Sequence, residues 1–301
     1  MNLTRRQFVT ALGCAALFPT ACSRGPRRDR VGIALGGGGA RGLAHVLMLE
    51  VLDELGIKPY RIAGTSIGAI IGVLYAAGKS GREIRALIDQ LTVSENESWI
   101  DALSGESGLR WLDFLLPELR RGGLLNPDGF IAFLDETLGV ERFDQLKIPL
   151  QVVATDFWSR EAAVFDSGLL MPAVQASMAL PGVFAPVTIG DRLLVDGGLV
   201  NPVPYDLIQQ DCDLTIAVDV IGLRTPGEDP IPSYLEATFE AFQILQSTVL
   251  KEKMRHRPPD IYIRPEIRDV RVLEFYKFEA IFQQAQPQKD RLKRQLEKLL
   301  G

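Results

Sequence analysis

The stretch ALGGGGARGLAH, Ala34 to His45, decides the fold. Its four consecutive glycines follow a short apolar run, Val31 to Leu35, that predicts a buried strand, and they precede a segment with helical periodicity. A glycine-rich turn between a strand and a helix exposes backbone N–H groups that bind anions. Gly37 to Gly42 also matches the G-x-G-x-x-G pattern of dinucleotide sites, which need an acidic residue at the end of the second strand.

The second predicted strand, Tyr60 to Ala63, ends without an acidic residue. It runs into Gly64-Thr65-Ser66-Ile67-Gly68, which is G-x-S-x-G at a strand-to-helix junction. A serine on such a turn exposes its hydroxyl, and glycines two positions before and after it let the neighbouring backbone pass. The helix that begins there adds its N-terminal dipole where negative charge develops. The pattern therefore favours a serine nucleophile at Ser66 over a dinucleotide site.

The rest of the chain continues to alternate strands and helices. Further buried strands are predicted at Leu150 to Thr155 and Leu214 to Val220, and helices at Arg41 to Leu55, Ile67 to Ala77 and Gly81 to Leu91. This alternation predicts an α/β fold, a three-layer α/β/α sandwich with a mostly parallel central sheet.

A nucleophilic serine needs a base, and the chain has only two histidines. A Ser-His-Asp triad would depend on His256, which is predicted in a cationic, proline-bounded loop, whereas His45 is predicted to be a packed or capping side chain. The alternative is Asp196, which a strand, Leu193 to Val195, delivers onto a Gly-Gly turn. A partly desolvated carboxylate within reach of the serine hydroxyl can act as the base.

Three motifs in this order resemble the patatin-like phospholipase family, most closely its small bacterial members. They are Gly37-x-Gly39-x-x-Gly42, Gly64-x-Ser66-x-Gly68 and Asp196-Gly197-Gly198. The segments Ala176 to Pro186 and Asn201 to Pro204 are also similar to the family, and the resemblance covers about residues 31 to 220. It implies a patatin-like sandwich related to cytosolic phospholipase A2.

The resemblance also implies a catalytic Ser-Asp dyad, with Ser66 as nucleophile and Asp196 as proton acceptor. It implies that Gly64 and Gly68 form the elbow, that Gly197 and Gly198 form the turn after the base, and that the oxyanion hole is built from Gly37, Gly38, Gly39, Ala40, Arg41 and Gly42. Arg41 is expected either to brace this loop or to meet a lipid phosphate. The acyl chain is expected among apolar side chains such as Leu180 and Phe184.

The implied activity is hydrolysis of fatty-acyl esters of (lyso)phospholipids, with a lipid ester and a membrane surface as partners and no cofactor. A broad carboxylesterase or acyltransferase with the same dyad, and a non-catalytic lipid-binding protein of the envelope, remain as alternatives. The net charge of −5 argues against a nucleic-acid partner. No Cys and His cluster has metal-ligand spacing, and Cys212 is expected to be a small, half-buried residue.

The first 22 residues predict an export signal. Thr4-Arg5-Arg6-Gln7-Phe8-Val9 resembles the twin-arginine signature, a short apolar run follows, and Cys22 resembles the acylated cysteine of bacterial lipoproteins, although Pro19 stands where an aliphatic residue is usual. We therefore expect a protein exported to the periplasmic side of a bacterial cell envelope and anchored through Cys22. A short uncleaved anchor or a fortuitous amphipathic N-terminus is the alternative.

The predicted organisation has four parts. Residues 1–22 are the export signal, 23–30 a basic linker, 31–220 the catalytic domain and 221–301 a helical C-terminal extension packed on the same domain. Within the domain, residues 92–130 lack a sustained period and predict an insertion or lid. Its apolar side chains would line a substrate entrance or pack on the core; they are Trp99, Trp111, Phe114 and Leu115.

Overall fold

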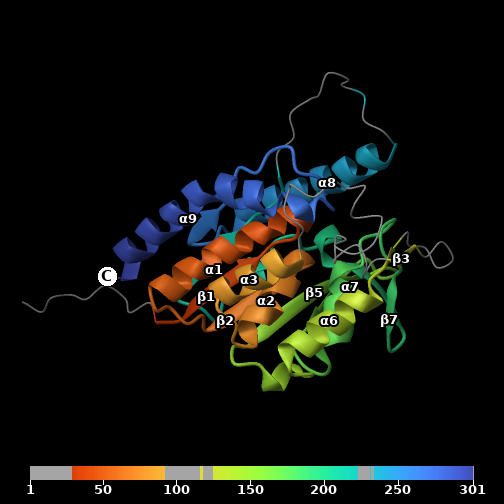
Figure 1. Ribbon diagram of the computed structural model, residues 1–301, viewed down its shortest axis with the longest axis horizontal. Helices are drawn as coiled ribbons and strands as arrows, with labels where there is room; N and C mark the ends of the chain where they lie inside the picture. The colour runs from red at the N-terminus through yellow and green to blue at the C-terminus, as the bar shows by residue number, and fades with distance from the viewer. Residues whose placement is uncertain (1–28, 92–115, 118–124, 223–230, 232–233, 301) are drawn as a thin grey trace, which may run out of the picture.

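The computed structural model describes residues 29–91, 116–117, 125–222, 231 and 234–300. The predicted signal, Cys22, and the four proposed entrance residues of the 92–130 segment lie outside the described residues. The structure is a three-layer sandwich around one large sheet, with helices on both faces (Figure 1). The predicted α/β/α architecture is confirmed.

Five parallel strands form the main part of the sheet. Their order is β10 (Ile261–Ile263), β9 (Leu214–Val218), β1 (Val31–Leu35), β2 (Arg61–Thr65) and β5 (Leu150–Asp156). Because parallel strands end at the same edge of a sheet, the turns after β1, β2 and β5 lie together. The glycine loop follows β1 and Ser66 follows β2, so both lie at this carboxyl edge.

Three antiparallel strands complete the sheet: β6 (Ala162–Phe165), β7 (Val187–Ile189) and β8 (Arg192–Asp196). β6 occupies one edge of β5, so β2 and β8 share the other edge. Thr65 of β2 pairs with Val153, and Asp196 of β8 pairs with the next residue, Ala154. The C-terminal ends of β2 and β8 therefore lie next to each other along one edge of β5 and point toward each other. A separate two-stranded sheet joins β3 (Leu116–Pro117) to β4 (Leu125–Asn126).

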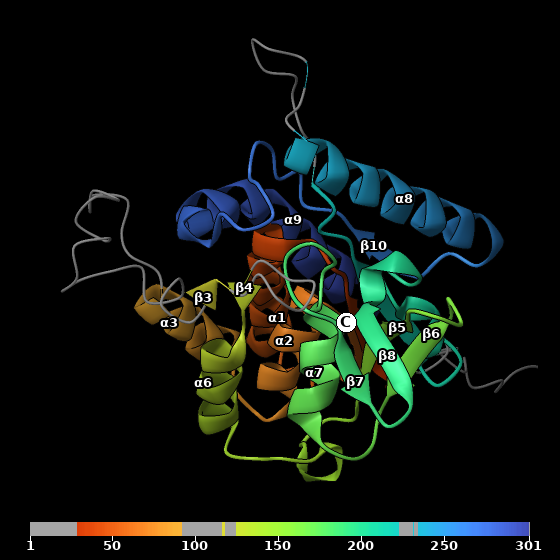
Figure 2. The ribbon, with the colours of Figure 1, turned by 90° about the vertical axis from the view of Figure 1, so that its right-hand side faces the viewer.

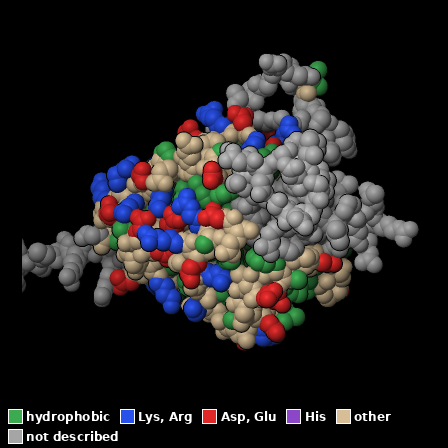
Figure 3. Space-filling model, in the orientation of Figure 1, with side chains coloured by type: hydrophobic (Ala, Val, Ile, Leu, Met, Phe, Trp, Pro, Cys, Tyr) green, Lys and Arg blue, Asp and Glu red, His purple; other side chains and the backbone are tan. Residues whose placement is uncertain are grey.

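Most of the helices pack against one face of the sheet. They are α1 (His45–Glu54), α2 (Ile67–Ala76), α3 (Gly81–Leu91), α6 (Asp128–Leu138), α7 (Leu170–Met178) and α9 (Phe278–Leu300). The C-terminal part of α8 (Tyr234–His256) and the short 3-10 helix η4 (Tyr205–Leu207) cover the other face, whereas Phe239 in the N-terminal part of α8 packs against the main core. α1 and α9 pack side by side, and acidic and basic side chains are interspersed over the surface around α9 (Figure 3).

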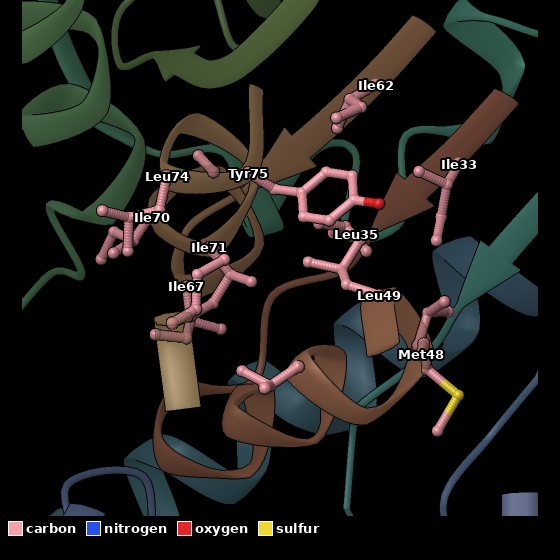
Figure 4. Packing of buried hydrophobic residues seen from close by; sticks show 14 of the residues in the cluster. Ile33, Leu35, Met48, Leu49, Ile62, Ile67, Ile70, Ile71, Leu74 and Tyr75 are labelled. Carbon is pink, nitrogen blue, oxygen red and sulfur yellow. The ribbon is translucent and has the colours of Figure 1, made fainter. Parts of the chain in front are cut away.

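The strands carry different side chains on their two faces, as alternation along a strand requires. Large aliphatic residues such as Ile33, Leu35 and Ile62 point toward α1 and α2, where they form the main core (Figure 4). The other face carries the alanines Ala34, Ala63 and Ala217. These small residues let Tyr205 and Leu250 of the second layer pack close to the sheet.

Three local details differ from the predictions. The segment predicted as one helix from Arg41 begins as a 3-10 helix, η1 (Gly39–Ala44), and becomes α-helical at His45. The boundary predicted at residue 220 does not separate a helical extension from the sheet, because β10 comes from beyond it and pairs with β9. His256 lies in the last turn of α8 and not in a loop. Among the described helices, none is long and apolar enough to cross a membrane.

Candidate active site

Ser66 sits on a strained turn between β2 and α2. Its φ of 55° lies in the left-handed region, which costs a non-glycine residue about 1 to 3 kcal/mol. Its N–H donates to Ser177 Oγ at 2.9 Å, and that hydroxyl donates to the carbonyl oxygen of Val153 at 2.6 Å. The Ser66 carbonyl accepts from Ala69 at 2.9 Å. These bonds from three separate elements hold the strained conformation in place.

The two glycines of G-x-S-x-G are required by close backbone approach. A Cβ added to Gly64 would lie 2.6 Å from the carbonyl oxygen of Gly68. A Cβ added to Gly68 would collide with the carbonyl oxygen of Leu35 at the end of β1. Larger residues at either position would push α2 away from the sheet and move Ser66 with it.

Asp196 is the last residue of β8 and is 3% exposed. Its Oδ1 accepts from the N–H of Gly198 at 2.7 Å. Burial raises the pKa of Asp196 to about 6, against the opposite effects of the nearby Ser66 side chain and the Gly198 N–H. The carboxylate is therefore mostly ionised at neutral pH, but it binds a proton more readily than an exposed aspartate.

The main chain on either side of Asp196 is also held. The Asp196 N–H donates to the Ala179 carbonyl at 2.9 Å, and the Asp196 carbonyl accepts from Thr155 Oγ1 at 2.8 Å. Gly198 leaves room for the side-chain amide of Gln246 from α8, which lies where a Cβ of residue 198 would be. The Gly197-Gly198 turn after Asp196 therefore allows α8 to pack directly over this residue.

The glycine loop supplies fewer free N–H groups than the six predicted residues suggest. The Gly37 N–H donates to the Pro202 carbonyl at 2.9 Å, and the Ala40 N–H donates to the Val272 carbonyl at 2.8 Å. Within the described part of the chain, the N–H groups of Gly38 and Gly39 donate to no carbonyl. These two N–H groups could therefore receive an anion, whereas the N–H groups of Gly37 and Ala40 are engaged elsewhere. Gly42, inside η1, allows close packing on Ile67.

Two buried side chains hold the carbonyl groups of this loop. Arg41 is 3% exposed, and its Nε donates to the Gly38 carbonyl at 3.3 Å. In a trans peptide the C=O and the next N–H point in opposite directions, so this bond orients the Gly39 N–H. Burial lowers the pKa of His45 to about 4, so the ring is neutral and its Nε2–H donates to the Gly36 carbonyl at 2.8 Å. Both side chains therefore hold the main chain of the glycine loop through hydrogen bonds to its carbonyl oxygens.

A polar cluster behind the loop includes residues that the sequence did not single out as functional. Pro202, whose carbonyl receives the Gly37 N–H, follows Asn201, whose carbonyl accepts from Thr65 Oγ1 at 2.9 Å. Lys253 of α8 donates to Asn201 Oδ1 at 2.6 Å and forms an ion pair with Asp206 at 2.5 Å. This cluster links the glycine loop, the end of β2 and α8.

Ser66 and Asp196 line an apolar pocket. Gly37 to Gly39 also line it, and Arg41, Gln243 and Gln246 are its other polar residues. The remaining lining is aliphatic or aromatic and comes mostly from α2, α3, α6, α8 and the segments after α7 and β10. It includes Ile67, Ile70, Leu74, Ile84, Leu87, Phe130, Phe133, Phe239 and Phe242, together with Leu180 and Phe184, which the sequence analysis placed near the acyl chain.

The comparison with protein families agrees with this geometry. Residues 33–208 match the model of the family described as patatin-like phospholipase. The chain belongs to the patatin-like phospholipase family. The match begins within β1 and includes the turn at Ser66, Asp196 and the Asn201 segment, so both candidate catalytic residues lie inside the matched region.

Patatin-like relatives share most of this chain but are longer. An uncharacterized NTE family protein of Mycobacterium tuberculosis is 36% identical over 212 residues, which cover 70% of this chain and 54% of the relative. Lysophospholipase NTE1 of Kluyveromyces lactis is 29% identical over 277 residues, which cover 84% of this chain and 18% of the relative. The chain thus spans about half the length of the mycobacterial relative and a smaller share of the fungal one. The crystal structure of VipD from Legionella pneumophila aligns with a TM-score of 0.48 at 15% identity, covering 90% of this chain and 67% of that chain.

Two other residues with reactive side chains, His256 and Cys212, line no part of the pocket that contains Ser66 and Asp196. The side chain of His256 is 78% exposed, contacts Glu252 at 3.0 Å and lines no part of the pocket, so the structure does not assemble a Ser-His-Asp triad around it. Burial raises the pKa of the Cys212 thiol to about 11, which makes it a poor nucleophile. Among the described residues, no group of three His, Cys, Asp or Glu side chains could hold a metal ion.

Proposed function

We propose that this chain is a serine hydrolase that cleaves fatty-acyl esters of lysophospholipids and phospholipids. The observation that carries the proposal is that Ser66, on its strained turn, and the buried Asp196 carboxylate line one apolar pocket together with the glycine loop. The name of the Kluyveromyces lactis relative, a lysophospholipase, supports a lysophospholipid as substrate.

In the first half of the reaction, Ser66 Oγ attacks the acyl carbonyl while its proton passes to Asp196. The N–H groups of Gly38 and Gly39 receive the negative oxygen, and such a donor is worth about 3 to 4 kcal/mol in serine hydrolases. Collapse of the tetrahedral intermediate breaks the ester C–O bond. The leaving alcohol takes the proton from Asp196, and the acyl group stays on Ser66.

In the second half, Asp196 accepts a proton from a water molecule that attacks the acyl-serine. The second tetrahedral intermediate expels Ser66 Oγ, which takes the proton back, and the fatty acid leaves. The apolar pocket supports this scheme because burying the acyl chain stabilises bound substrate by about 0.8 kcal/mol per methylene.

The pH dependence follows from Asp196. The carboxylate must be ionised to accept the serine proton, and its pKa in the free protein is about 6. We expect kcat/KM to be level above about pH 7 and to fall tenfold per pH unit below about pH 6. Initial rates on a soluble ester at constant ionic strength test this. A profile that stays level down to pH 4 would contradict the assignment of Asp196 as the base.

The direct test is the release of fatty acid from lysophosphatidylcholine by the parent protein and by Ser66→Ala. We expect the substitution to lower the rate by about 10³-fold or more, because it removes the nucleophile. Ser167→Ala, at an exposed serine in the loop before α7, is the matched control and should leave the rate unchanged. Parent-like activity of Ser66→Ala would refute the proposal. A comparable loss of hydrolysis rate in His256→Ala would instead support a Ser-His-Asp triad that includes His256.

The predicted export and lipid anchor form a second part of the proposal, supported by the residue pattern around Arg5, Arg6 and Cys22. In the bacterial membrane fraction, the mature protein should begin at a diacylated Cys22, which mass spectrometry would detect. Cys22→Ser should release the protein from that fraction. A mature protein that retains Met1 would contradict the lipid anchor.

A further inference from the structure

The turn between β5 and β6 exposes two aromatic side chains. Trp158 is 75% exposed and Phe157 is 44% exposed, and their rings pack edge to face with centroids 4.9 Å apart. Asp156 Oδ1 accepts from the N–H groups of Trp158 at 3.1 Å and Ser159 at 3.2 Å, and the Asp156 carbonyl accepts from Arg160 at 2.9 Å. This aromatic turn, residues 157–160, is therefore held in a fixed shape that leaves both rings in solvent.

The aromatic turn lies at the same edge of the sheet as the dyad. Thr65, the residue before Ser66, pairs with Val153, and β5 continues for three more residues to Asp156. At about 3.3 Å per residue, the turn stands about 10 Å beyond the level of Ser66. Its Phe157 N–H donates to β8 at 2.8 Å, the strand that ends on Asp196, and β5, β6 and β8 lie together in Figure 2.

The area of this apolar surface distinguishes a lipid surface from a second protein as the partner. Two partly exposed aromatic side chains offer on the order of 200 to 300 Å², whereas a stable protein interface needs about 800 Å² from each partner. A tryptophan and a phenylalanine together are typical of side chains that enter the interface of a bilayer. The area therefore fits a lipid surface better than a second copy of the chain.

The neighbouring charges select the kind of lipid. Asp156, Arg160 and Glu161 lie in or beside the aromatic turn, Asp191 lies in the adjoining turn between β7 and β8, and Arg192 begins β8. Three acidic and two basic side chains leave a small negative net charge, which does not attract an anionic membrane. Attraction must then come from the aromatic rings, which do not require charged headgroups.

We propose that the aromatic turn inserts into the headgroup region of a zwitterionic phospholipid surface and holds the edge of the sheet that carries Ser66 against it. The inference rests on the proposed function, because a lipid-ester substrate is what makes a membrane the partner at this edge. An acyl ester could then enter the apolar pocket without crossing bulk water.

The test is binding of the full chain to phosphatidylcholine vesicles, measured by co-sedimentation in a Ser66→Ala background, which prevents hydrolysis. The double variant Phe157→Ser/Trp158→Ser should bind at least about tenfold more weakly, because it removes both exposed aromatic side chains of the turn. Tyr60→Ser is the matched control: Tyr60 is 45% exposed, but it precedes β2 at the opposite edge of the sheet. Its binding should be unchanged, and the N-terminal segment is common to all variants.

Three outcomes would overturn the inference: unchanged binding of the double variant, an equal loss in Tyr60→Ser, or a change in oligomeric mass in place of vesicle binding. With Ser66 restored, the double variant should hydrolyse vesicle lipid at least tenfold more slowly and a soluble short-chain ester at the parent rate. Absence of ester hydrolysis by the parent would refute the proposed function and leave the binding result to decide the membrane inference. A parent-like melting temperature of the double variant controls for folding.

Discussion

Asp196 and Glu54 are carboxylates that the fold tunes in opposite directions. Asp196 is buried at the active-site edge with uncharged partners, and its pKa rises to about 6. Glu54 lies where α1 meets α9, and hydrogen bonds from Lys293 and Lys289 lower its pKa to about 2. The carboxylate that we propose as the proton acceptor has no cation among the groups that shift its pKa, whereas the carboxylate that joins two helices pairs with two lysines.

The two environments have opposite effects on folding. Because the pKa of Asp196 is above its ordinary value of 3.8, the stability it contributes is present below about pH 4 and is lost as pH rises through about 6. The pKa of Glu54 is below its ordinary value of 4.5, so its contribution is present above that pH and is lost as pH falls toward 2. The active-site edge thus carries a stability cost at neutral pH, and the helix contact offsets part of it.

The largest effect is expected for Asp196→Asn. The amide keeps an acceptor for the Gly198 N–H but cannot take the Ser66 proton, so kcat should fall about 10³-fold. The free energy of unfolding should rise by up to about 3 kcal/mol at pH 8, since no buried charge remains, and the gain should vanish at pH 4. Rates of ester hydrolysis test the loss in kcat, and denaturant unfolding at pH 4 and pH 8 tests the change in the free energy of unfolding. A less stable variant at pH 8 would contradict this description of the site.

Gly39→Ala should have the next largest effect. Gly39 has a φ of 58° and lies against the carbonyl of Val272, so a methyl group would strain the backbone and move a free N–H away from the oxyanion. We expect kcat to fall by about 10²-fold, in the range for loss of one oxyanion donor. In Gly37→Ala the new Cβ would lie 3.4 Å from Ser66 Cβ, and the loss should stay within about tenfold. Equal losses in the two variants would contradict the assignment of Gly39 as a donor.

A smaller effect is expected for Ser177→Ala. The Ser177 hydroxyl joins the Ser66 N–H to the Val153 carbonyl, and its removal leaves both groups unpaired in a buried place. Such a loss costs about 1 to 3 kcal/mol, part of which would fall on the strained conformation of Ser66. We expect kcat to fall about tenfold with KM nearly unchanged. A change in KM alone would show that Ser177 shapes the pocket and does not hold the elbow.

The sequence predicts those parts of the candidate site at which the backbone geometry demands a particular residue type. Gly64 and Gly68 are required by contacts that no side chain permits, and the strand-turn-helix pattern around Ser66 is local. Which N–H groups of the glycine loop stay free depends on Pro202 and Val272, which are distant in sequence and were not identifiable in advance.

Two other features lacked a local signal. Lys253 acts through Asn201, about 50 residues earlier, and nothing in its own helix distinguishes it from an exposed lysine. β10 has three residues and is recognisable as a strand only because β9 supplies its partner. The aromatic turn likewise has no signature in the sequence, since the exposure of its side chains depends on the whole fold.

The smallest effect is expected for Glu54→Gln at the contact of α1 with α9. Partly exposed ion pairs contribute little, so the free energy of unfolding should fall by less than about 1 kcal/mol at pH 7, and the difference should shrink in high salt or below about pH 3. Glu50→Gln should cost more, because Glu50 is 4% exposed and pairs with both Arg85 and Lys289. Ester hydrolysis should be unchanged in both variants. A loss of activity in Glu54→Gln as large as in Ser177→Ala would mean that the helix contact and the active-site edge are coupled, and the contrast between the two carboxylates would then fail.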